Sequence, residues 1–283
     1  MLEVSCKLDK QQKELLDIRG KRRMYMLCSE SKLHSMIGAS ICESELISLT
    51  KKYGICDVCD FSGLHISISK RLLDRVVEVM YKYPRLRSRI CFLGSRKGYL
   101  DLVDKLISAD DAEVKSLGIQ YIFSKENTRQ IGQVIKELFD SHILKSDEVL
   151  LAQTIWTGGA VDGIMIDERV FGARDIRQAK IDLEKSVLVS HFPNGCDSID
   201  GPIYHEIGHT LDFLCDVAND EQLLAEYNSL SALDIQNNLS GYATRSIREF
   251  IAEGFSEYMS SATPRTLAKH VVEAIDRCYQ KVK

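Results

Sequence analysis

The segment His205-Glu-Ile-Gly-His209 constrains this chain more than any other feature. Residues four positions apart lie on one face of an α-helix, so His205 and His209 can direct both imidazoles at one metal ion. Glu206 follows the first histidine and is placed to act on a water molecule bound to that metal. Asp200 and Pro202 suit the N-cap and the first turn of such a helix. The segment therefore predicts a helix that carries two ligands of a zinc site.

The same five-residue pattern also arises by chance on amphipathic helices, so a third ligand has to identify the kind of site. Metzincins need a glycine three positions and a histidine six positions after the second histidine. Those positions hold Asp212 and Cys215, which excludes that class.

Gluzincins take a glutamate from a later helix instead, and residues 247–259 predict such a helix. Glu249 and Glu253 share one of its faces. We expect one carboxylate to bind the metal and the other to hydrogen-bond a ligand histidine. Two glutamates at this spacing are otherwise typical of a solvated helix face.

Length and composition bound the other possibilities. The chain has 283 residues, 45% hydrophobic and 28% charged, which is ordinary for a soluble globular protein of one large domain or of one domain with an appendage. No apolar run is long enough to cross a membrane, and the N-terminus lacks the apolar core of a signal peptide. The nine cysteines do not form a secreted disulfide framework. We therefore expect a cytoplasmic or virion-associated protein without a membrane partner.

The charge is unevenly distributed. Residues 1–100 hold 19 Lys and Arg against 11 Asp and Glu, a balance of +8, and the remainder holds 18 against 30, a balance of −12. This predicts a basic lobe facing an acidic one, or a basic surface that meets an acidic partner. A nucleic-acid partner is disfavoured, because no motif of interleaved basic and aromatic residues accompanies the basic region.

Residues 1–50 are predicted to form an N-terminal helical extension, with helices over 8–18 and 38–52. Residues 51–283 are predicted to form one α+β domain, with a mixed sheet and helices before the zinc helix and a helical lobe after it. The predicted strands are 55–61, 89–93, 119–123 and 163–171. The predicted helices before the zinc helix are 69–83, 128–139 and 179–188.

Cys56 and Cys59, with His65 nearby, are compatible with a zinc knuckle or a redox pair. A knuckle needs four ligands, and the fourth would come from Cys42 or from farther away. The alternating pattern of residues 55–61 would also direct the two sulfur atoms to different faces of a strand. Buried cysteines that pack as small hydrophobic side chains are the favoured interpretation.

Residues 204–213 and 240–255 resemble the anthrax lethal-factor-like metallopeptidases, a gluzincin group that also includes the Pro-Pro endopeptidases. Similar domains occur at the C-terminal end of some phage minor head proteins. Residues 163–171 and 190–195 are similar to the phage-type members. The resemblance covers residues 160–262 closely and residues 50–160 weakly, and it implies a zincin-like, two-lobed metallopeptidase.

The resemblance also implies a role for each matching residue. The ligands of the single Zn²⁺ ion that it implies are His205, His209 and Glu249. It makes Glu206 the general base and Glu253 the residue that hydrogen-bonds a ligand. Tyr242, seven positions before the ligand glutamate, matches a tyrosine whose hydroxyl stabilises the oxyanion of the tetrahedral intermediate. Without the resemblance, a loop tyrosine is more often a packing residue.

Residues 163–171 match the edge strand that lies over the family's cleft. An exposed edge offers unpaired backbone groups to which an extended peptide can add. Substrate binding is therefore expected at Gly163, Ile164, Met165 and Ile166. An interior strand is the alternative, because the apolar alternation suits both positions.

These expectations combine into a zinc-dependent endopeptidase that hydrolyses protein or peptide substrates, with Glu206 as the general base. The alternative is a phage or mobile-element structural or maturation factor that uses the domain as an interaction module, with phage head or other mobile-element proteins as partners. The intact catalytic positions favour the enzyme, because a binding module has no need of Glu206. A toxin that acts inside another cell would need export without a visible signal.

Overall fold

The computed structural model describes residues 2–3, 28–108, 125–138, 151–156, 162–172 and 174–282. Its contacts divide the chain into two compact units, residues 1–173 and 174–283, whereas the sequence predicted a boundary near residue 50. The predicted helix over 8–18 and the predicted strand over 119–123 lie outside the described residues. Within the described ranges, no helix combines the length and the apolar character that a membrane crossing requires.

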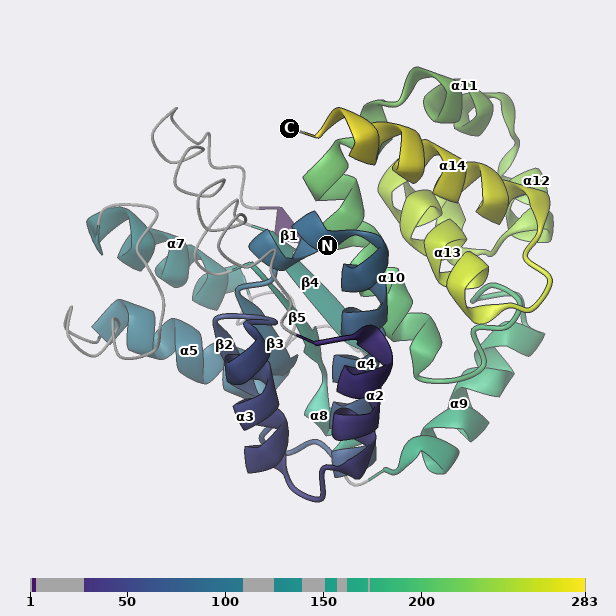
Figure 1. Cartoon of the computed structure of the whole chain (residues 1–283). Helices are drawn as coiled ribbons and strands as arrows, with labels where there is room; N and C mark the ends of the chain where they lie inside the picture. The colour runs from purple at the N-terminus through teal and green to yellow at the C-terminus, as the bar shows by residue number, and fades with distance from the viewer. Residues whose placement is uncertain are drawn as a thin grey trace. The chain divides into compact units, whose positions relative to one another are not determined.

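The first unit contains a mixed sheet with the strand order β1-β4-β5-β3-β2 (Figure 1). The strands are β1 (Leu2–Glu3), β2 (Val58–Asp60), β3 (Phe92–Ser95), β4 (Ala152–Trp156) and β5 (Gly163–Ile166). β2, β3 and β5 are parallel, whereas β4 is antiparallel to β5 and parallel to β1. Every residue of β3 and β5 is buried, as expected for central strands of a sheet covered on both faces.

The prediction of an exposed edge strand over residues 163–171 is wrong. β5 ends at Ile166 and pairs with β3 on one side and with β4 on the other. The chain then forms the short helix α8 (Glu168–Phe171), capped by Asp167, which accepts a hydrogen bond from the backbone of Arg169. The residues predicted to bind substrate, all in β5, are Gly163, Ile164, Met165 and Ile166. Their strand is not a sheet edge to which a peptide could add.

Six further helical segments of the first unit are described. They are α2 (Glu30–Ala39), α3 (Glu43–Tyr53), α4 (Ile66–Lys82), η1 (Pro84–Ser88), α5 (Arg96–Ser108) and α7 (Lys125–Leu138). α4 buries an apolar stripe that includes Leu72, Val76 and Met80. α2 and α3 both pack on α4, so these two helices belong to the first unit.

The described residues of the second unit form helices and connecting turns and contain no strand. The helical segments are α9 (Ile176–Leu188), α10 (Asp200–Cys215), η3 (Val217–Asn219), α11 (Glu221–Ser229), α12 (Ala232–Asn238), η4 (Tyr242–Arg245), α13 (Ile247–Ser260) and α14 (Thr266–Lys281). A mixed sheet with helices therefore precedes the predicted zinc helix and a helical region follows it, which confirms the α+β class.

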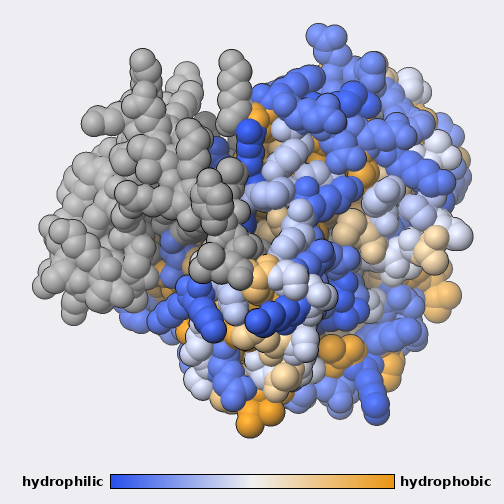
Figure 2. All heavy atoms as spheres, in the orientation of Figure 1, coloured by the Kyte–Doolittle hydropathy of each residue, from blue (hydrophilic) through white to orange (hydrophobic). Residues whose placement is uncertain are grey.

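α13 is the central helix of the second unit, in contact with both α10 and α14 (Figure 1). All residues from Glu249 to Glu257 are buried, so this helix has no solvated face along those residues. The outer surface is hydrophilic where α11 and α14 lie, as the blue region of Figure 2 shows. Lys269 and Glu273 are exposed on α14. Three glutamates of α13, at positions 249, 253 and 257, are thus enclosed in a largely apolar core, and each needs a partner there.

Gly208 permits the close approach of α10 to α13. A Cβ atom at this position would lie 2.9 Å from the Cα atom of Ala252 and 3.2 Å from the Cβ atom of Phe255. We expect Gly208→Ala to lower the free energy of unfolding by about 1–3 kcal/mol, because the helices must separate to accept the methyl group. Gly38→Ala on α2 is the matched control, since nothing lies within 4 Å of the added atom.

Chemical denaturation of both variants measures this difference. The control should gain up to about 1 kcal/mol, because alanine favours the helix over glycine. An equal gain in Gly208→Ala would show that the two helices are not in tight contact at this position.

Candidate metal site

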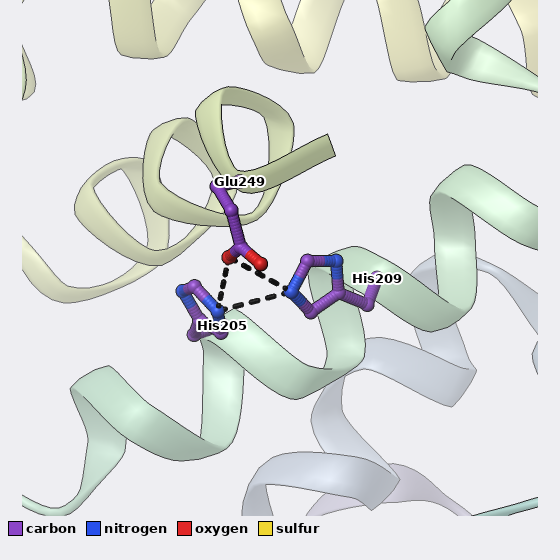
Figure 3. Close-up of side chains that lie close together, drawn as sticks. All are labelled: His205, His209 and Glu249. Atoms are coloured by element: carbon purple, nitrogen blue, oxygen red, sulfur yellow. Dashed lines mark hydrogen bonds and ion pairs between the residues drawn. The ribbon is translucent and has the colours of Figure 1, made fainter. Parts of the chain in front are cut away.

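α10 and the first turn of α13 bring three potential metal ligands together (Figure 3). The Nε2 atoms of His205 and His209 lie 3.0 Å apart. The Oε2 atom of Glu249 lies 3.2 Å from each of these nitrogen atoms. The side chains are 12%, 4% and 10% exposed, respectively, so the cluster lies just below the surface. Within the described part of the chain, it is the only group of three or more His, Cys, Asp or Glu side chains placed to hold a metal ion.

The spacing of these atoms suits a tetrahedral zinc ion. Nitrogen and oxygen ligands at about 2.0–2.1 Å from zinc lie about 3.3 Å from one another in a tetrahedron. The three observed separations are close to this value. The Oε2 atom of Glu249 is buried. None of its contacts with described residues has the geometry of a hydrogen bond. A cation would supply the partner that this oxygen lacks.

Glu253 orients the first histidine from the opposite side of its ring. Its Oε1 atom lies 2.7 Å from Nδ1 of His205, and its Oε2 atom accepts a hydrogen bond of 2.6 Å from the hydroxyl of Ser240. If Nδ1 carries the proton and donates it to Glu253, the lone pair of Nε2 points to the centre of the cluster. The carboxylate therefore selects the tautomer that a metal ligand needs.

The pKa shifts of Glu249 and His205 indicate that a negative carboxylate and a positive group are in contact. Burial alone would raise the pKa of Glu249, but contact with His205 and His209 outweighs it and holds that pKa well below its usual range. Burial alone would lower the pKa of His205, but contact with Glu249 and Glu253 raises it well above the usual value. Both shifts favour a carboxylate next to positive charge, which is also what a bound cation provides.

Tyr242 lies beside the ligands at the start of η4. Its ring centroid is 5.7 Å from that of His205 and 5.6 Å from that of His191. The guanidinium carbon of Arg245 lies 4.2 Å from the centre of the tyrosine ring. Burial, followed by the charge of Glu249, raises the pKa of Tyr242. The phenol therefore keeps its proton at neutral pH and can donate a hydrogen bond.

Glu206 is buried on α10, and it lies between His205 and His209 in the sequence. It is close enough to both His205 and Tyr242 that its charge contributes to the raised pKa of each. The structure thus groups in one region all the residues that the sequence predicted for metal binding and catalysis. They are His205, Glu206, His209, Tyr242, Glu249 and Glu253.

Comparisons with protein-family models, with curated proteins and with solved structures find no match for this chain. The assignment of the site therefore depends on its own residues and geometry. The similarity to lethal-factor-like metallopeptidases stays a prediction from the sequence.

Two residue pairs that support the site were not predicted. Asp212 accepts a hydrogen bond of 2.7 Å from Arg248 and another of 2.7 Å from the backbone of Ala218, which joins α10 to the residue next to Glu249. Ser240 joins Glu253 to the turn before α13. The short spacing of Asp212 from His209 is a clue to the first pair, whereas nothing in the sequence marks the second.

Cys56 and Cys59 belong to the first unit, whereas the candidate metal site belongs to the second. Cys56 and Cys59 are buried, which agrees with the favoured interpretation as packed side chains. Burial, followed by a hydrogen bond with Cys56, raises the pKa of Cys59 well above its usual value. Cys56 precedes the first residue of β2, Val58, so the alternation of a strand does not apply to it. His65 caps α4 instead of joining a knuckle.

Proposed function

We propose that this chain is a zinc-dependent endopeptidase of the gluzincin type, with the zincin-like, two-lobed fold that its resemblance implies. The observation that carries the proposal is the convergence of two imidazole nitrogen atoms and one carboxylate oxygen within 3.0–3.2 Å of one another. A donor set of two histidines and one glutamate is typical of catalytic zinc sites, which leave a position open for water or substrate. The proximity of Glu206 and Tyr242 supports a hydrolytic role rather than a structural one.

In this proposal His205, His209 and Glu249 hold the ion. Zinc bound there would act as a Lewis acid, lowering the pKa of a water molecule and polarising the carbonyl group of the substrate. Glu253 contributes by holding His205 in the ligating tautomer through the 2.7 Å contact. The contacts between α10 and α13 and the Asp212–Arg248 pair join the two helices that carry these three residues.

Two side chains perform the proton and charge chemistry. Glu206 removes a proton from the attacking water and passes it to the leaving nitrogen of the cleaved peptide bond. The hydroxyl of Tyr242 donates a hydrogen bond to the oxygen that becomes negative as the carbonyl carbon turns tetrahedral. Its raised pKa keeps this donor protonated at neutral pH. Because the bond cleaved in this scheme is a peptide bond, the proposed substrate is a protein or a peptide.

Metal analysis of the purified protein tests the proposal first. We expect about one zinc per chain, and we expect Glu249→Ala to lose most of it, because two histidines alone leave the ion with too few protein ligands. Glu273→Ala is the matched control, since that carboxylate is exposed on α14. A chelator should abolish hydrolysis of an unfolded protein substrate, and added zinc should restore it.

Two results would overturn the proposal. One is a wild-type protein that holds no zinc even after it is supplied. The other is a zinc-loaded protein that cleaves no member of a mixed peptide library analysed by mass spectrometry.

A further inference from the structure

Ser240 connects two parts of the candidate site that are separate in sequence. Its side chain is fully buried. The hydroxyl donates a hydrogen bond of 2.6 Å to Oε2 of Glu253 and accepts one of 3.1 Å from the backbone N–H of Ala243. One donor and one acceptor are thus both used, and a hydroxyl is among the few small groups that can supply them together.

The hydrogen bond to Glu253 connects Ser240 to the proposed metal ligand His205. Glu253 is buried, and its second carboxylate oxygen lies 2.7 Å from Nδ1 of His205. Ser240 therefore donates a hydrogen bond to one oxygen of a buried carboxylate, and the other oxygen of that carboxylate orients the histidine. If the hydroxyl is removed, Oε2 loses a partner, and the carboxylate can turn away from the imidazole to regain one.

The second bond leads to Tyr242. Ala243 is the next residue in the turn η4, so its N–H fixes the start of the turn that carries the tyrosine. The same turn is held from outside by backbone bonds from Gly241 to Ser190 (2.7 Å) and from Tyr242 to His191 (3.3 Å). The side chain of Ser240 thus connects this turn to α13.

We infer that Ser240 is a positioning residue that couples the orientation of His205 to the placement of Tyr242. The effect of Ser240 on Tyr242 rests on the proposed function. Its effect on His205 bears on metal binding alone.

Ser240→Ala removes both bonds. We expect its zinc affinity, measured by competition with a chromogenic chelator, to fall about 10-fold, the lower end of the effect of outer-shell partners on metal sites. At saturating zinc, kcat for a peptide substrate should fall about 10-fold with little change in KM, because the tyrosine acts on the transition state. Ser240→Thr keeps the hydroxyl and should restore most of both losses.

Ser256→Ala is the matched control. Ser256 is equally buried and lies on α13, but its hydroxyl bonds to the carbonyl of Gly201 at 2.8 Å and contacts Cys196 instead of Glu253. We expect a similar loss of stability in both alanine variants but an unchanged zinc affinity in the control. If Ser240→Ala does not fold, Ser240→Cys places a weaker donor at the same position and should show a smaller loss of the same kind.

A double variant isolates the coupling to the tyrosine. If Ser240 acts through Tyr242, then Ser240→Ala combined with Tyr242→Phe should have the kcat of Tyr242→Phe alone. Zinc affinity of Ser240→Ala within twofold of the Ser256→Ala value would overturn the inference. Absence of peptidase activity in the zinc-loaded wild type would overturn the proposed function instead, and the affinity measurement would still decide the coupling to His205.

Discussion

Replacing Glu206 with glutamine is expected to slow peptide hydrolysis about 10³-fold and to leave the zinc content unchanged. Glutamine has nearly the same size, so α10 and both ligand histidines keep their positions. Its amide cannot accept a proton from water, and general-base catalysis of this kind contributes about 10²–10⁴-fold. The loss should appear in kcat, measured with the best substrate of a peptide library and with the metal content determined on the same samples.

This variant also separates an enzyme from an interaction module. A phage or mobile-element factor that uses the domain only for binding would keep its biological effect in Glu206→Gln. Hydrolysis that persists at the wild-type rate would show that another residue removes the proton. Zinc lost together with activity would show that Glu206 supports the metal site instead, so the metal determination is the essential control.

Replacing Arg265 with methionine is expected to lower the free energy of unfolding of the second unit by about 3–5 kcal/mol. Arg265 contacts both carboxylate oxygens of Glu257, with a shortest separation of 2.6 Å, and Glu257 is fully buried. Removal of the guanidinium leaves this carboxylate in the core without its cation. Arg265 also bonds to the carbonyl oxygen atoms of Asn237 and Leu239, which precede Ser240.

Two comparisons make this prediction specific. The double variant with methionine at both Glu257 and Arg265 should recover most of the loss, because no buried charge remains. Arg174→Met removes one partner of an exposed pair with Asp182 and should cost less than about 1 kcal/mol. Urea unfolding measures all three. Equal effects of the two single arginine variants would show that the Glu257 pair is as solvated as the surface pair.

The grouping of the candidate ligands could be predicted from sequence because helix geometry determines the directions of their side chains. His205 and His209 are four residues apart, and the same spacing joins Glu249 to Glu253, so each helix needs only its own periodicity to place two groups on one face. The resemblance then supplied Tyr242, which the structure places beside His205. Contacts within one turn or one helix face are the ones that a sequence pattern encodes.

Longer-range features were predicted less well. The apolar residues of β5 suit an edge strand and an interior strand equally, and only the pairing with β3 and β4 distinguishes the two positions. Asp200 matched an N-cap, but α10 starts with it and Ile199 precedes the helix without a side-chain cap. Ser240 acts through its bond to Glu253, thirteen residues later, and no periodicity connects these positions.

The turn that carries Tyr242 is joined to the segment before α10 by two backbone hydrogen bonds, from Gly241 to Ser190 and from Tyr242 to His191. Backbone bonds of this kind do not depend directly on the side chains at positions 191 and 192. Those side chains can therefore be exchanged while the frame around the tyrosine is kept. Under the proposed peptidase function, a saturation library at His191 and Phe192, whose rings border Tyr242, is the place to begin altering cleavage preference.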